Sequence, residues 1–209
     1  MELSILNMAG KETGKKVVLN DAIFGIEPNE HAIYLDVKQF LANNRQGTAK
    51  AKQRSENAHS TRKLGRQKGG GGARPGDFKS PVRVGGGTIF GPVPRSYEFK
   101  LNRKVKQLAR KSALSLRASQ DQIIVLDALT FEAPKTKAMI EVLNNLNVAG
   151  KKVTFILNEV NTNAIKSAAN LQKTNVVSVN ELNTYTIMNS NVVVLTEASA
   201  AAIEATFNA

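Results

Sequence analysis

Side chains that can bind phosphate are concentrated in one segment of the chain. Residues 45–117 hold nineteen of the 29 Lys and Arg residues but only three acids, which gives this segment a net charge of +16 and the other 136 residues a net charge of −4. The guanidinium group of Arg binds phosphate through two parallel hydrogen bonds, and the ammonium group of Lys binds it as a point charge. The segment therefore predicts a polyanion-binding region, and nucleic acid is the polyanion that it favours.

The residues between these cations refine the prediction. Gly, Gln, Ser and Pro are interleaved with the cations, together with a few aromatic residues: Phe78, Phe90, Tyr97 and Phe99. Glycine lets a backbone approach a folded nucleic acid closely, and sparse aromatic rings make base stacking a minor contribution. Recognition of shape and phosphate is therefore expected to dominate.

Two carboxylates provide the best argument for catalysis. Asp127 and Glu159 follow the apolar runs IIVL and FILN, and ligands usually bind at the carboxyl ends of parallel strands. No base, nucleophile or metal ligand accompanies them in the sequence, so the favoured interpretation is that they begin loops or cap helices. The alternative is an RNA-modifying or RNA-cleaving α/β enzyme whose basic arm captures its substrate.

The sequence has few of the residues that bind metals or cofactors. The chain has no cysteine and two histidines, His31 and His59. The Gly69–Gly72 run lacks the GK[ST] ending of a phosphate-binding loop, and the GxGxxG spacing from Gly85 would need glycine at Phe90. We expect no cofactor, no metal and no membrane partner, since no apolar run is long enough to span a bilayer. A soluble, intracellular, noncatalytic protein is predicted.

The segments flanking the basic region predict a globular α/β body. Apolar runs at 123–126, 153–157, 176–179 and 192–195 read as strands, and they alternate with expected helices at 102–116, 135–146, 163–171 and 181–188 and an alanine-rich carboxyl terminus. This alternation predicts a three-layer, parallel-sheet (Rossmann-like) fold with helices on both faces. At the amino terminus we expect strands at 3–6 and 17–19 joined by a turn, a short helix capped by Asn20 or Asp21, and a helix at 29–41.

The domain boundaries follow from where this periodicity stops. Residues 1–44 and 100–209 are assigned to the body, and residues 45–99, which sustain neither a helical nor a strand period, to an extended basic loop. Ten of the fifteen glycines fall between positions 65 and 91. The helix at 102–116 should pack through one side and meet phosphate with the other; the packing side is Leu101, Val105, Leu108, Ala109 and Leu116, and the basic side is Arg103, Lys106, Arg110 and Arg117.

An ordered series of short motifs gives the chain a family resemblance. They read RQGT at 45–48, RSE at 54–56, RQKG at 66–69, AR at 73–74, SP at 80–81, GGG at 85–87, FGP at 90–92, KSAL at 111–114 and APKTK at 133–137. Together they closely resemble the large-subunit ribosomal protein L-four family of bacterial type. The resemblance covers essentially the whole chain.

The resemblance implies a cytoplasmic structural protein on the ribosome, with a loop running through large-subunit ribosomal RNA. It implies a role in early assembly and a loop tip, Arg66, Gln67, Lys68 and Gly69, that lines the peptide exit tunnel. Neighbours there would be the L-twenty-two protein, the nascent peptide and macrolide antibiotics. The RNA-binding residues expected are Arg45, Gln46, Lys50, Lys52, Arg54, Arg62, Lys63, Arg66, Lys68, Arg74, Lys79, Arg83, Arg95, Arg103, Lys106 and Arg110.

The tip departs from the family pattern at two positions. Gly65 stands where the family commonly has tryptophan, and Gly72 stands where it commonly has arginine. These replacements remove a stacking surface and a phosphate-binding group. The resemblance therefore does not fix the local path of this tip or its drug contacts.

Overall fold

The structure is a computed structural model that describes residues 1–208. Contacts between Cα atoms divide the chain into two compact units. The first, which we call the body, comprises residues 1–41 and 100–209, and the second, which we call the arm, comprises residues 42–99.

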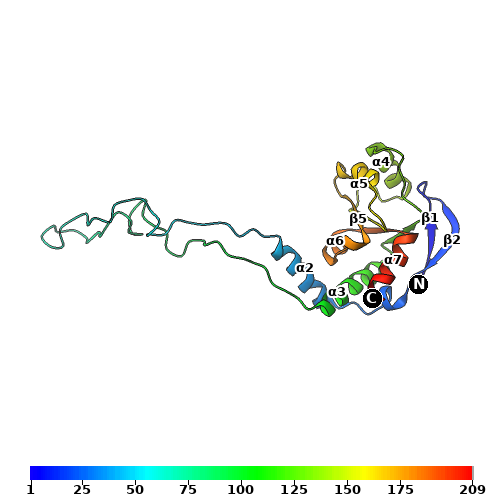
Figure 1. The fold of residues 1–209 in the computed structure, drawn as a ribbon, viewed down its shortest axis with the longest axis horizontal. Coiled ribbons are helices and arrows are strands. Elements are labelled where there is room, and N and C mark those ends of the chain that lie inside the picture. Colours follow the sequence, from blue (N-terminus) through cyan, green and yellow to red (C-terminus); the bar gives the residue numbers. More distant parts are fainter. Residues whose placement is uncertain (209) are drawn as a thin grey trace. The chain divides into compact units, whose positions relative to one another are not determined.

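The body is built on a β-sheet with helices around it (Figure 1). The sheet has six strands in the order β2-β1-β3-β6-β4-β5. Only β1 and β2 pair antiparallel among the described strands, and every other neighbouring pair is parallel. The strands are β1 (Glu2–Leu6), β2 (Glu12–Val18), β3 (Ile123–Leu126), β4 (Val153–Leu157), β5 (Thr174–Ser178) and β6 (Val192–Thr196). The predicted α/β class, with its mostly parallel sheet, is confirmed.

Helices cover both faces of this sheet because its central strands carry apolar side chains in alternate directions. In β6, Val193 and Leu195 join one buried cluster, while Val192 and Val194 join the other. The first cluster is completed by α1 (Asp21–Phe24), α2 (Glu30–Asn43), α3 (Arg103–Ser119), the 3-10 turn η1 (Val179–Glu181), α6 (Thr184–Asn189) and α7 (Glu197–Asn208). The second is completed by α4 (Thr136–Asn145) and α5 (Thr162–Ala169).

The amino-terminal hairpin differs from its prediction. The turn expected before residue 17 is much shorter, because β2 begins at Glu12 and pairs with β1 from there. Its polar residues Glu12–Lys16 are exposed on an edge strand, so they carry no alternating apolar signal. The strand expected at 176–179 likewise begins earlier, at Thr174.

Helix α3 also packs differently from its predicted apolar side. Leu108 is 40% exposed, whereas the buried residues are mostly small: Ala109, Ser112, Ala113, Leu114, Ser115 and Ala118. Small side chains let α1 and the segment after it approach α3 closely. The Ser112 and Ser115 hydroxyls accept hydrogen bonds from the Asn29 and Ile26 amides.

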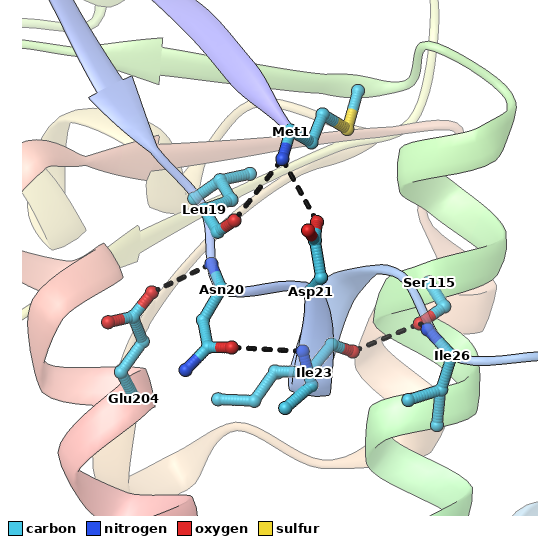
Figure 2. A network of polar contacts seen from close by, with 9 residues as sticks. Met1, Leu19, Asn20, Asp21, Ile23, Ile26, Ser115 and Glu204 are labelled. Atoms are coloured by element: carbon cyan, nitrogen blue, oxygen red, sulfur yellow. Dashed lines mark hydrogen bonds and ion pairs between the residues drawn. The ribbon is translucent and has the colours of Figure 1, made fainter.

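A polar network secures the short helix α1 (Figure 2). The Asn20 side chain caps it by accepting from the Ala22 amide at 2.9 Å, as one of the two predicted caps. The Asn20 amide donates to Glu204 of α7, and Ser115 of α3 donates to the Ile23 carbonyl at 3.0 Å. The four-residue helix α1 is thus joined to two helices that are distant from it in sequence.

The arm contains no regular element beyond the end of α2. Residues 44–102, all of which the structure describes, form turns and bends but no helix or strand. Backbone hydrogen bonds nevertheless connect its outgoing and returning halves: the Arg95 amide donates to Gly47, the Ala51 amide to Pro92 and the Thr88 amide to Lys52. Among the arm's described residues, the buried ones are Asp77 and Gly87, and neither contributes an apolar side chain.

Candidate nucleic-acid interface

The predicted RNA-binding side chains are largely accessible. Twelve are exposed, namely Arg45, Gln46, Lys50, Lys52, Arg54, Arg62, Lys63, Arg66, Lys68, Arg74, Arg95 and Arg103, and four are half-buried, namely Lys79, Arg83, Lys106 and Arg110. Thirteen of these sixteen belong to the arm, and Arg103, Lys106 and Arg110 belong to α3 of the body. The structure organises them into several local groups.

The first group closes the base of the arm around Tyr97. The guanidinium of Arg45 lies 3.8 Å from the centre of the Tyr97 ring, and that of Arg95 lies 4.5 Å from it. These are cation–π distances, and they hold two cations fifty residues apart in sequence against one ring. Arg45 and Arg95 remain exposed, so two phosphate-binding groups are presented together.

Gly47 permits this closure. Its φ is +65°, and a Cβ atom at this position would lie 2.2 Å from the Arg95 carbonyl oxygen and 2.8 Å from Tyr97 Cε2. A side chain here would meet both the unusual backbone conformation and the returning chain. Sequence reasoning placed Arg45 and Arg95 separately on RNA and gave Tyr97 no role, because no local spacing connects these residues.

The two cations also alter the chemistry of the ring. Hydrogen bonding by Arg95, followed by the charges of Arg95 and Arg45, lowers the pKa of the Tyr97 hydroxyl below its usual value. The same logic applies at Glu56, where a hydrogen bond from Lys50 lowers the pKa of the carboxyl group. Water reaches both groups and screens these interactions.

The second group surrounds the buried carboxylate of Asp77. Arg54 Nη2 donates to Asp77 Oδ2 at 3.0 Å, and the Arg54 side chain is still 62% exposed. The Arg54 backbone passes so close to Gly87 that a Cβ there would lie 2.3 Å from the Arg54 amide nitrogen. Asp77 therefore positions a guanidinium that also faces solvent, which sequence reasoning did not foresee.

A pocket of about 730 Å³ opens beside this ion pair. Its lining combines polar, cationic and apolar side chains: Gln53, Arg54, Ser55, Thr61, Asp77, Lys79, Thr88, Ile89 and Phe90. All of them belong to the arm. Nearby in sequence, the Phe78 ring contacts both His59, at 6.2 Å between ring centres, and the Arg83 guanidinium, at 5.8 Å.

The predicted tip is the most open part of the arm. Arg66, Gln67, Lys68 and Gly69 are all exposed, and Lys63 Nζ donates to the Gln67 side chain. A Cβ atom added at Gly65, Gly69, Gly70 or Gly71 would meet no atom of a non-adjacent residue within 4 Å, so no close approach requires these glycines. Positive φ values of +84° at Gly69 and +66° at Gly71 account for two of them.

Helix α3 divides its cations between solvent and the body. Arg103 is exposed, and Lys106 and Arg110 are half-buried. Arg117, expected on the same basic side, instead donates to the Met188 carbonyl at 2.9 Å and the Ile187 carbonyl at 3.3 Å. Burial lowers the pKa of its guanidinium. The expected phosphate-facing role of Arg117 is wrong, because its N–H groups donate to carbonyls in the last turn of α6.

The two carboxylates considered for catalysis lie at the predicted strand ends. Asp127 and Glu159 are exposed and line one pocket of about 380 Å³ with Asn161, Thr162 and Thr196. They begin loops, as one of the two structural interpretations expected, but neither caps the helix that follows: Lys135 precedes α4 and Asn161 caps α5. Within residues 1–208 there is no group of three His, Asp or Glu side chains arranged for a metal ion.

No helix in the described part of the chain combines the length and apolarity that a bilayer crossing requires. The fold and its accessible cations define a protein with an α/β body and a basic, glycine-rich arm. A sequence profile of the ribosomal protein L4/L1 family matches residues 17–206, and the chain belongs to this family. It is a structural, non-enzymatic ribosomal protein, located in the cytoplasm as part of the ribosome.

Individual relatives match along essentially their full length. The large ribosomal subunit protein uL4 of Parabacteroides distasonis is 61% identical over 209 residues, which cover 100% of both chains. The proteins of the same name from Bacteroides fragilis and Porphyromonas gingivalis are 59% identical over 204 residues, with 98% of both chains covered, and 57% identical over 209 residues, with 100% of both covered. The family predicted from the ordered motifs is confirmed.

Proposed function

We propose that this protein is a structural component of the large ribosomal subunit whose arm binds the large ribosomal RNA. The main support comes from the arm, which presents thirteen of the sixteen predicted RNA-binding side chains and buries no apolar side chain among its described residues. Such a surface suits a partner that supplies negative charge. The relatives are named as proteins of the large ribosomal subunit, which supports this choice of partner.

The energetics of the arm support an RNA-dependent structure. Ordering a backbone costs about 1 kcal/mol per residue, and the arm lacks the apolar burial that offsets this cost in the body. Phosphate contacts and the release of counterions supply a compensating free energy. The arm is therefore mobile in the free protein and ordered on the ribosome; sharp, dispersed amide signals from residues 50–90 in the isolated protein would contradict this.

The finer roles concern the tip and the time of binding. The exposed Arg66–Gly69 segment lines the peptide exit tunnel, near the L-twenty-two protein and the nascent peptide, and close to where macrolide antibiotics bind. Its accessible cations and unconstrained glycines support a position against RNA and passing peptide. Binding occurs early in subunit assembly, before the RNA around the arm has closed.

Chemical footprinting on large-subunit ribosomal RNA tests the central proposal. The full chain is compared with a variant lacking residues 50–90, which removes ten Lys and Arg residues and two acids. We expect localised protection with the full chain, and a smaller footprint and a shallower salt dependence with the variant, because the logarithm of affinity changes by roughly 0.7–0.9 per neutralised phosphate in each logarithmic unit of salt.

A circular dichroism melt of both proteins is the control for folding of the body. Equal melting with a lost footprint assigns RNA binding to the arm. Protection that is unchanged by the deletion, or binding that does not discriminate ribosomal RNA from duplex DNA, contradicts the proposal.

A further inference from the structure

Three residues of the returning half of the arm form a local bulge. The Ala51 amide donates to the Pro92 carbonyl at 3.0 Å, and the Thr88 amide donates to the Lys52 carbonyl at 2.9 Å. Ala51 and Lys52 are adjacent in sequence, whereas their partners on the returning half, Pro92 and Thr88, are four positions apart. The intervening segment, residues 89–91, has no place in this pairing and must project from it.

Phe90 stands at the centre of the bulge in an unusual conformation. Its φ is +54°, a region that residues with large side chains rarely adopt, and its side chain is fully exposed. Gly91 keeps the bulge close to the opposite half, since a Cβ there would lie 2.7 Å from Ala51 Cβ. A bulky ring held in a strained backbone and left in water points to a function outside the free protein.

The surroundings of the ring indicate what covers it. Phe90 and Ile89 line the 730 Å³ pocket together with Arg54 and Lys79, and the volume falls within the roughly 300–1,000 Å³ of small-molecule sites. Asp77 fixes Arg54 at this pocket through the 3.0 Å ion pair. An apolar protein surface would have to desolvate these cations without compensation, whereas a nucleotide offers a π face and an anion together.

We infer that Phe90, Arg54 and Lys79 form a binding site for one unpaired nucleotide of RNA. The base stacks on the Phe90 ring, and Arg54 and Lys79 bind its phosphate. Asp77 is a positioning residue that acts through Arg54. This inference rests on the proposed binding of ribosomal RNA and adds a base-stacking contact to an arm otherwise suited to phosphate.

Tryptophan fluorescence tests the site directly because the chain has no tryptophan. Phe90→Trp places a single reporter in the bulge, and Val84→Trp places one at a fully exposed position outside the pocket lining. Each variant is titrated with a large-subunit ribosomal RNA transcript, and binding is measured in parallel by filter retention. We expect saturating RNA to quench Phe90→Trp at least about twofold and to change Val84→Trp little, since stacking on a base quenches indole emission.

Two further substitutions separate stacking from bulk and from strain. Phe90→Leu keeps apolar volume without a π face and should weaken RNA binding about 5- to 100-fold. Phe90→Gly relieves the positive φ and should weaken it at least as much, although the backbone becomes less strained. Val84→Ala serves as the matched control, with an unchanged affinity.

The outcomes are distinct. Quenching confined to position 90, with weaker binding by both Phe90 variants, supports the site. Normal retention of RNA with unquenched Phe90→Trp overturns it and assigns the ring to another partner, such as an apolar protein surface, while the proposed RNA binding stands. Absence of RNA binding by the wild-type chain overturns both proposals.

Discussion

The body and the arm are organised by different kinds of contact. Every buried apolar side chain of the described residues lies in the body, where two clusters occupy opposite faces of one sheet. The arm relies on backbone hydrogen bonds between its halves, on glycines at close approaches, and on cations placed by Tyr97 and Asp77. In the body, the burial of apolar side chains specifies the fold. In the arm, the contacts specify where the cations lie, and the partner has to supply the remaining stabilisation.

Removing a core side chain should produce the largest effect and confine it to stability. Leu114 of α3 is fully buried in the cluster with α1 and α7, so Leu114→Ala should lower the free energy of unfolding by about 2–5 kcal/mol. Urea denaturation followed by circular dichroism measures this. Val84→Ala in the arm is the control and should leave the midpoint unchanged; a comparable loss there would break the distinction between the two units.

Two arginines of one helix should separate stability from RNA binding. Arg117→Ala leaves the Met188 carbonyl without its side-chain donor and the Ile187 carbonyl with the Ser190 hydroxyl alone, and it should cost about 1–2 kcal/mol of stability, since Arg117 is partly screened by water. Arg103→Ala, at an exposed position of the same helix, should instead weaken RNA binding and leave stability unchanged. Thermal melts and filter binding on both variants give the answer, and a shared phenotype would refute the separation.

Substitution of Gly47 should loosen the arm and spare the body. Gly47→Ala places a methyl group against the Arg95 carbonyl and Tyr97, so we expect faster hydrogen exchange at the Arg95 amide with an unchanged melting temperature. Gly14→Ala is a matched control: its φ is +75°, but no atom of a non-adjacent residue lies within 4 Å of the added methyl. That change should cost only the strain of the backbone, about 1 kcal/mol. Unchanged exchange at Arg95 would show that the closure is not needed.

The smallest effect is a shift in one tyrosine titration. Because Arg95 and Arg45 lower the pKa of Tyr97, the wild-type chain should contain a tyrosine that ionises below the usual value of about 10. Arg95→Gln should raise that transition, and Tyr97→Phe should abolish it, as measured by the ultraviolet absorbance of tyrosinate. The lowered pKa favours the closed arm base above about pH 10, and this contribution disappears as the pH falls through the pKa of folded Tyr97. A transition insensitive to Arg95 would contradict the contact.

The fold was predictable wherever burial left a pattern. The runs at 123–126, 153–157 and 192–195 match β3, β4 and β6 within one residue because strands buried on both faces require continuous apolar residues. The first five residues of β2 were not predictable in this way. They form an exposed edge strand whose pairing with β1, rather than its composition, makes it a strand.

The interface was predictable in composition and not in arrangement. Charge density identified the cations, but the spacing of α3 placed Arg117 with the phosphate-binding side, and its carbonyl partners lie about seventy residues away. Tyr97 and Asp77 also organise residues distant in sequence, and Phe90 is distinguished by a backbone angle that its identity does not encode. Such features depend on contacts between residues far apart in the chain, and the local periodicity of the sequence does not predict those contacts.

The hydrogen bond between Gly47 and Arg95 has a topological consequence. It holds the two ends of residues 48–94 together, so that this segment forms a closed loop. RNA therefore meets a loop with no free end, unlike a tail over which an RNA ring could pass. A nucleic acid that encircles this loop must either admit both halves of it together or close around it afterwards. A narrow RNA ring therefore has to form after the protein is in place, whereas a wide one can receive the whole hairpin.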